Sequence, residues 1–154
     1  MTAFAVLCGA LLVFRALGML GVARLAAWRS AAAHAMAIML VVTASAHFVP
    51  ETVTVMPNHA DLVRIVPPFV PMPDAMVYLT GVLELLGAAG LVLTATRRAA
   101  GLCLAALYVA LLPANVYAVL ADVPYNGGEA SPLWLRIPLQ AIYITVALWS
   151  SKSR

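Results

Sequence analysis

The sequence predicts an all-α fold, a polytopic transmembrane helix bundle with five spans in a single membrane domain over residues 1–154. Of these residues, 64% are hydrophobic and only 10% are charged, whereas soluble domains average about half apolar and roughly a quarter charged. The apolar residues gather in five runs, each long enough to cross a bilayer, which takes about 20 residues. The segments between the runs hold most of the charged residues and most of the prolines.

The five predicted spans are residues 3–23, 30–49, 75–95, 99–121 and 133–151. The first run has no basic segment before its apolar core and is longer than the core of a signal peptide, so we expect it to remain as a span. In the fifth run, Arg136 and Pro138 interrupt the beginning. Both lie near one end, where an arginine reaches the headgroups and a proline loses little in a first helical turn.

Positive charges predict the orientation. Lysine and arginine gather at residues 24–29, 97–98 and 152–154, which an alternating chain places on one side of the membrane. The other side carries five of the six acidic residues, with only Arg64 and Arg136 as cations. Because loops rich in lysine and arginine stay in the cytoplasm, we predict the N-terminus outside and the C-terminus in the cytoplasm.

Residues 50–74 are predicted to form an external cap, because six of the ten prolines lie there. Prolines limit this segment to a short helix. Asn58 is suited to cap such a helix from His59 to Val66, with Asp61 in its first turn. The alternative is a mobile proline-rich linker. In the second outer loop, residues 126–128 read Asn-Gly-Gly, which predicts a turn.

Polar side chains inside the apolar runs are the candidate functional groups, since a charged group at the centre of a membrane helix costs about 2.5 to 3.5 kcal/mol. From the rise of about 1.5 Å per residue, Glu84, Asn115 and Gln140 lie about 10 to 13 Å below the outer boundary, and His47 lies about 3 Å below it. Small residues flank Glu84 at helical spacing and allow close helix packing. We therefore expect the polar stripes to face the bundle interior and to form a pocket in its outer half.

Each of these residues has a functional and a structural interpretation. Glu84 is either an ionisable group at the floor of an externally open cavity, or a neutral acid that hydrogen-bonds Asn115 or Gln140 and joins helices. Asn115 and Gln140 are either pocket groups or links between helices, and His47 is either a pocket group or an interfacial hydrogen-bonding residue. Arg15 either pairs with Glu84, snorkels to the interface, or pairs with a partner subunit.

The spacing of the basic residues, cysteines and possible metal ligands excludes several classes of function. The basic residues are scattered, whereas nucleic-acid binding needs a contiguous basic stripe. Cys8 and Cys103 lie at opposite depths and form no Cys-x-x-Cys pair. No group of histidine, cysteine and carboxylate residues has metal-ligand spacing, so we predict no metal and no cofactor of the chain's own.

Four stretches resemble the DoxX-like family of small bacterial integral membrane proteins. They are AMAIMLVVTASAHFVP (residues 35–50), LVRIVPPFVPMPDAMVYLTGVLELLGAAGLVL (62–93), ALLPANVYAVL (110–120) and WLRIPLQ (134–140). The likeness covers about residues 31–149 and is most specific in the Thr-Gly-x-x-Glu block and the Pro-Ala-Asn block. It implies a four-helix core to which the first span is an N-terminal addition, and it points to His47, Glu84, Asn115 and Gln140.

The resemblance also implies a multi-pass protein of the bacterial plasma (inner) membrane. DoxX-like proteins take their name from membrane subunits of a thiosulfate:quinone oxidoreductase, and their relatives include cargo receptors and receptor-assembly chaperones. Our leading hypothesis is a protein that is non-catalytic on its own and binds a small amphipathic ligand, a quinone or a lipid, or else a partner protein. The predicted ligand-binding residues are His47, Glu84, Asn115, Tyr117, Arg136 and Gln140.

Two alternatives stay open. The first is a membrane subunit of a quinone-linked oxidoreductase, or an enzyme, in which Glu84 assisted by His47 transfers protons to a lipid-soluble substrate. The second is a structural accessory subunit of a larger membrane complex. Because the chain lacks cysteine pairs and cofactor motifs, a redox role would have to reside in a partner.

Overall fold

The computed structural model describes residues 2–124 and 131–152. Within these ranges the chain is all-helical, with no strand, as the sequence predicts. The helices are α1 (Thr2–Met19), η1 (Ala23–Leu25, a 3-10 helix), α2 (Trp28–Ser45), α3 (His59–Arg64), α4 (Pro73–Val92), α5 (Arg97–Leu120) and α6 (Leu133–Ser150). The predicted turn at residues 126–128 lies outside the described residues, as do Glu129 and Arg154.

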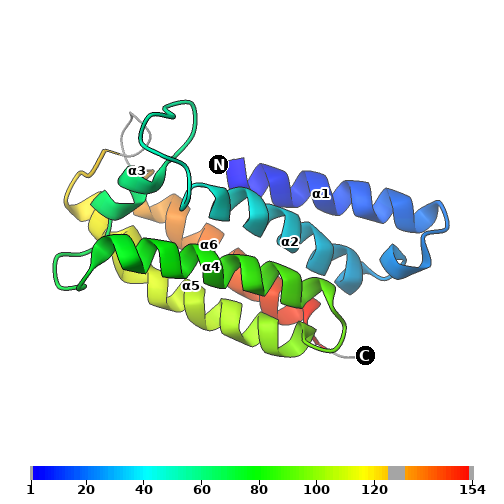
Figure 1. The fold of residues 1–154 in the computed structure, drawn as a ribbon. Coiled ribbons are helices and arrows are strands. Elements are labelled where there is room, and N and C mark those ends of the chain that lie inside the picture. Colours follow the sequence, from blue (N-terminus) through cyan, green and yellow to red (C-terminus); the bar gives the residue numbers. More distant parts are fainter. Residues whose placement is uncertain (1, 125–130, 153–154) are drawn as a thin grey trace.

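Four helices form the central bundle. Helix α2 packs against α4, α4 against α5, α5 against α6, and α6 back against α2. Helix α1 lies along the outside of this bundle, packed against α2 (Figure 1). Because α2 also touches α1, it is the helix with the most helical neighbours in the described part of the chain. Helix α1 is thus peripheral to the bundle formed by the other four long helices.

Four helices, α1, α4, α5 and α6, are long and apolar enough to cross a membrane. Helix α2 is as long as α1, with 18 residues, but it is not one of the four. It carries Arg29 and His34, and its buried residues are six alanines with Met36, Met39 and Leu40. A helix surrounded by other helices needs small residues for close packing more than it needs strong hydrophobicity. Length and composition therefore establish four candidate spans, where the sequence predicted five.

The ends of the first two predicted spans differ from the helices. The first was predicted to reach residue 23, but α1 ends at Met19. Gly21 follows with φ 103°, a left-handed conformation that favours glycine, and the chain then turns into η1. The second was predicted to reach residue 49, but α2 ends at Ser45. Apolar runs continue through these turns, so hydropathy alone places both ends too late.

Residues 46–72, which we call the cap, cover one end of the bundle (Figure 1). Asn58 begins α3, and its side chain accepts a hydrogen bond from the Asp61 amide at 3.1 Å. The Asp61 carboxylate in turn accepts one from the Asn58 amide at 3.3 Å, which completes a capping box. The prediction of Asn58 as helix cap is confirmed. The helix stops at Arg64 because Pro67 and Pro68 follow, and a proline disfavours helix in the residue before it.

The stripe around Glu84 faces inward. Gly81, Glu84, Gly87 and Ala88 are all buried within α4. A Cβ atom on residue 81 would lie 2.6 Å from the Cβ of His47, and one on residue 87 would collide with Leu104 of α5. The small residues thus let α4 approach the α2 end on one side and α5 on the other, as the sequence predicts. This close approach brings Glu84 next to side chains from α2.

Candidate functional site

The first polar cluster lies between α2 and α4, and we call it the Glu84 cluster (Thr43, His47, Thr80 and Glu84). Glu84 is only 6% exposed. The Thr43 hydroxyl donates a hydrogen bond to Glu84 Oε2 at 3.0 Å. His47 Nε2 lies 4.0 Å from Glu84 Oε1. Both oxygens of the buried carboxyl group are therefore engaged by residues of α2 and the turn after it.

The ring of His47 is oriented by its other nitrogen. Nδ1 lies 2.6 Å from the carbonyl oxygen of Val77. A carbonyl oxygen can only accept, so Nδ1 must carry a proton. In the neutral ring Nε2 is then an acceptor that faces Glu84 Oε1. The two groups attract each other only when a proton resides on one of them, either on the Glu84 carboxyl group or on Nε2. At 4.0 Å the two atoms are within ion-pair range but too far apart for a direct hydrogen bond, so the pair is an electrostatic contact in a buried setting.

The second polar cluster lies between α5 and α6, and we call it the Asn115 cluster (Tyr108, Asn115, Arg136 and Gln140). The Asn115 side-chain amide donates to Gln140 Oε1 at 2.7 Å, and Arg136 donates to Asn115 Oδ1 at 3.0 Å. Gln140 Nε2 donates to the carbonyl oxygen of Tyr108. Donors and acceptors of both amides are thus used between the helices. This arrangement links α5 to α6 and leaves little for an additional ligand.

The two clusters are not joined by a hydrogen bond within the described ranges. The expected bond of Glu84 to Asn115 or Gln140 is not formed there, because Thr43 and His47 occupy the carboxyl group instead. Tyr108 lies between the clusters. Its carbonyl oxygen accepts from Gln140, and its hydroxyl lies within electrostatic range of Glu84. The six predicted ligand-binding residues are therefore divided rather than gathered in one pocket.

Arg15 is not a partner of Glu84 in this structure. Its guanidinium donates to the carbonyl oxygens of Leu25 and Ala26 and lies 4.4 Å from the ring centre of Trp28. These groups belong to the connection between α1 and α2, at the end of the bundle opposite the cap. Of the three interpretations, snorkelling toward the interface is the one that this geometry favours.

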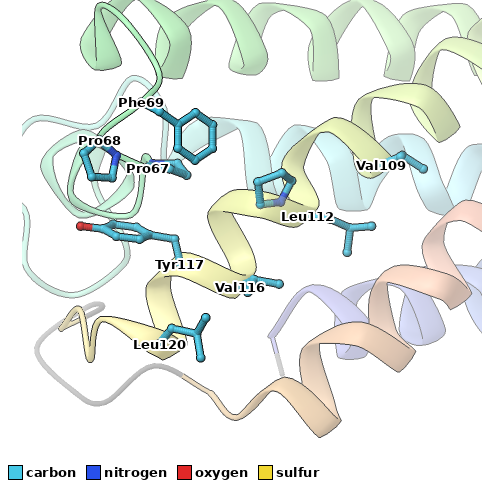
Figure 2. Close-up of a pocket in the computed structure, with 9 residues that line it drawn as sticks. Pro67, Pro68, Phe69, Val109, Leu112, Val116, Tyr117 and Leu120 are labelled. Carbon is cyan, nitrogen blue, oxygen red and sulfur yellow. The ribbon is translucent and has the colours of Figure 1, made fainter.

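A groove of about 590 Å³ lies between the cap and α5, and we call it the α5 groove. Figure 2 shows the cap residues facing α5 across it. The side chains that line it are Pro67, Pro68, Phe69, Val109, Leu112, Pro113, Val116, Tyr117 and Leu120. The lining is apolar apart from the Tyr117 hydroxyl. Prolines and aromatic rings from two separate segments thus line an open, ligand-sized and almost wholly apolar groove.

Tyr117 is the one predicted ligand-binding residue that lines the α5 groove. Asn115 is two positions earlier, and two residues turn a helix by about 200°. Tyr117 and Asn115 therefore lie on nearly opposite faces of α5, one toward the groove and the other toward α6. The sequence analysis assigned both residues to one pocket and did not separate the two faces of the helix.

The other groove residues were not predicted as site residues. Val109, Val116 and Leu120 recur at helical spacing on α5, but an apolar stripe of this kind is also what a lipid-facing surface requires. Pro67 and Phe69 line the groove only because the cap folds back over α5. This tertiary contact cannot be predicted from local sequence. The proline content of residues 67–73 was the only local signal.

Comparison with known proteins gives one match. A family model described as a domain of unknown function (DUF8561) matches residues 36–151. No curated protein and no solved structure matches the chain. The matched range begins within α2 and includes α3, α4, α5 and α6, while α1 precedes it. The family domain therefore covers the second half of α2, the rest of the central bundle, the cap and both polar clusters.

Proposed function

The chain belongs to this family of unknown function, and on the evidence of its site we propose that it is a multi-pass membrane protein that binds a neutral, ring-headed lipid of the quinone class in the α5 groove. On its own it would catalyse no reaction. The observation that carries this proposal is the groove itself, whose volume lies in the range of small-molecule sites, about 300–1,000 Å³. Its position at the cap end of α5 suits a ligand whose tail remains in the bilayer.

The lining favours a neutral ring over a charged headgroup. No charged side chain lines the groove, and burying a charge without a partner is strongly unfavourable. Pro67, Pro113, Phe69 and Tyr117 offer flat apolar surfaces on which a ring packs well. The Tyr117 hydroxyl lies at the edge of the groove, where it offers a single hydrogen-bond donor to a carbonyl oxygen. These features together match a quinone better than a phospholipid.

The proposal includes five spans, with the N-terminus outside and the C-terminus in the cytoplasm of a bacterial plasma membrane. Helix α2 packs against α1, α4 and α6, three helices that are apolar enough to cross a membrane. A helix so enclosed would cross with its neighbours. The odd number of crossings then puts the three arginine- and lysine-containing segments on one side, where the positive-inside rule expects them. The DoxX-like resemblance supports the same arrangement.

The test is the small-molecule content of the purified protein. We expect the protein extracted in mild detergent to carry a quinone, identified by mass spectrometry of its organic extract. Val116→Trp fills the groove and should lower the bound quinone several-fold. Leu102→Trp is the matched control, because Leu102 lies on the same helix, is 55% exposed and does not line the groove. Equal quinone content in all three proteins, or phospholipid alone, would refute the proposal.

A second candidate function is proton transfer in a quinone-linked oxidoreductase. It is favoured by the facing of His47 Nε2 and Glu84 Oε1 across 4.0 Å. Under this alternative, Glu84→Gln lowers turnover of the assembled complex while quinone content is unchanged. Under the leading proposal the same variant changes neither. An accessory subunit, the third hypothesis, would co-purify with a stoichiometric partner and carry no quinone.

A further inference from the structure

A second cavity, of about 750 Å³, lies at the end of the bundle opposite the cap. We call it the basic pocket. It is bounded by the start of α2, the connection between α4 and α5, and the end of α6. Its lining includes four cationic side chains and two indole rings, contributed by Trp28, Arg29, Arg97, Arg98, Trp149 and Lys152. None of the acidic residues that the structure describes lines it.

The cations in this pocket come from segments far apart in the chain. Residues 28–30, 94–98 and 149–152 meet only because the helices alternate in direction and end together. Arg24 also lies within electrostatic range of Arg97. Like charges brought this close repel one another, and a bound anion would relieve that repulsion.

Arg97 is held in place by the helix before it. Its Nε donates to the carbonyl oxygen of Leu91 at 2.6 Å and its Nη2 to that of Val92 at 3.2 Å. A guanidinium group has five N–H donors, so these two bonds orient the side chain and leave further donors. Arg98 and Lys152 form no ion pair within the described ranges. The pocket thus contains one fixed cation and at least two that are available.

Two helices also begin at the basic pocket. Helix α2 starts at Trp28 and α5 at Arg97, and neither N-cap residue, Ala27 or Thr96, makes a side-chain capping hydrogen bond. The first amides of a helix have no partner within the helix, and its N-terminal end carries a partial positive charge. Two such ends therefore add to the positive potential produced by the side chains. Arginine donors and helix amides together are well suited to the oxygen atoms of a phosphate.

We propose that the basic pocket binds the phosphate group of an anionic phospholipid. The shared chemistry is that of a phosphate anion, and the two tryptophans indicate the lipid as its source. Trp28 and Trp149 are 55% and 39% exposed, and exposed tryptophans are typical of the membrane–water interface. A lipid seated here would place its phosphate among the cations and its acyl chains beside the bundle. This site is independent of the α5 groove, which lies at the other end and is lined without charges.

The test uses tryptophan fluorescence in the full chain. Trp28 and Trp149 line the pocket, so Trp134→Phe removes the third tryptophan of the sequence and leaves two local reporters. The protein is reconstituted in phosphatidylcholine vesicles that contain a small fraction of brominated phosphatidylglycerol or, in parallel, brominated phosphatidylcholine. We expect the anionic brominated lipid to quench several-fold more strongly than the neutral one at the same fraction.

Variants of the cationic residues test whether the preference for the anionic lipid arises in the basic pocket. Arg98→Gln combined with Lys152→Gln should lower the preference for the anionic lipid several-fold, while Arg98→Lys combined with Lys152→Arg keeps the charges and should retain it. Arg64→Gln removes a cation at the cap end and is the matched control, with the preference unchanged. Helical circular dichroism verifies that each variant is folded. Equal quenching by both lipids, or a preference that loss of both charges leaves undiminished in a folded protein, would overturn the proposal.

Added inorganic phosphate distinguishes a phospholipid headgroup from free phosphate as the bound anion. Added at constant ionic strength, it should leave the quenching unchanged if the ligand is a phospholipid. If inorganic phosphate displaces the brominated lipid while chloride does not, the pocket takes free phosphate and the assignment to a lipid is wrong.

Discussion

His47 and Glu84 face each other across the contact between α2 and α4, with Nε2 4.0 Å from Oε1. The Nδ1 atom of the same ring lies 2.6 Å from the carbonyl oxygen of Val77. One side of the imidazole is thus fixed as a donor by the backbone of α4, and the other is directed at a buried carboxyl group on the same helix. The pair is placed by Gly81, because any larger residue there would meet the ring of His47.

The first prediction concerns the protonation of this ring. Because Nδ1 faces an atom that can only accept, it should carry a proton whether His47 is neutral or charged. Nitrogen-15 NMR of histidine-labelled protein distinguishes protonated from unprotonated ring nitrogens. His47→Gln identifies its signal, and His34 and His59 serve as internal comparisons. An unprotonated Nδ1 in His47 would contradict the geometry.

Gly81→Ala should destabilise the protein. A Cβ at this position would lie 2.6 Å from the Cβ and 2.8 Å from the Cγ of His47. Relieving such overlap usually costs about 1–3 kcal/mol. Gly9→Ala is the control, because a Cβ there meets nothing within 4 Å and alanine favours a helix over glycine. We expect thermal unfolding in detergent to occur earlier for Gly81→Ala only, and equal midpoints for the two variants would count against the close packing.

Loss of Gln140 should weaken the contact between α5 and α6. Gln140→Ala removes the donor to the Tyr108 carbonyl oxygen and the acceptor for Asn115. Leaving such groups unsatisfied costs about 1–3 kcal/mol. Thr145→Ala, on the exposed side of α6, removes only a bond within the helix at 2.8 Å.

A double-mutant cycle measures the coupling between the two amides. Asn115→Ala should cost less when Gln140 is already alanine, by about 0.6 kcal/mol, the average for polar contacts between membrane helices. Unfolding in detergent gives both values. Strict additivity of the two changes would mean that the Asn115–Gln140 bond does not stabilise the protein.

The proposed orientation predicts which loops are accessible from outside. In a chain with Cys8→Ser and Cys103→Ser, a cysteine at Thr52 in the cap should react with a membrane-impermeant maleimide added to intact cells. A cysteine at Ala23, in η1, should react only after the membrane is opened. Both positions are exposed on the protein surface, so a difference in labelling reports the side of the membrane. The reverse pattern would invert the topology.

The sequence was informative where composition and local chemistry decide the structure. The apolar runs predicted the long helices, and Asn58 with Asp61 predicted the start of α3, because a capping box depends on residues close in the chain. The small stripe on α4 predicted the buried face of Glu84. Helix α2 was harder, because Arg29 and His34 lower its hydropathy although its alanines are buried against other helices.

The site was predictable only in part, for a geometric reason. Depth along a span follows from counting residues, but it put His47 about 10 Å above Glu84, whereas the two side chains lie 4.0 Å apart. The direction of each side chain around its helix depends on which helices are neighbours. Glu84 therefore contacts Thr43 on α2 and His47 in the turn after α2, and Asn115 contacts Gln140 on α6. The α5 groove depends on the path of the cap and had no local signal beyond its prolines.

The measurement that tests the central claim most directly is photolabelling with a quinone that carries a photoreactive azide, followed by peptide mapping. Our account predicts that the label attaches to the two segments that line the α5 groove, residues 67–69 and 109–120. Excess unlabelled quinone should prevent the labelling, and Val116→Trp should reduce it. A label spread evenly over the lipid-facing surfaces of α1, α4 and α6, and insensitive to competing quinone, would contradict the account.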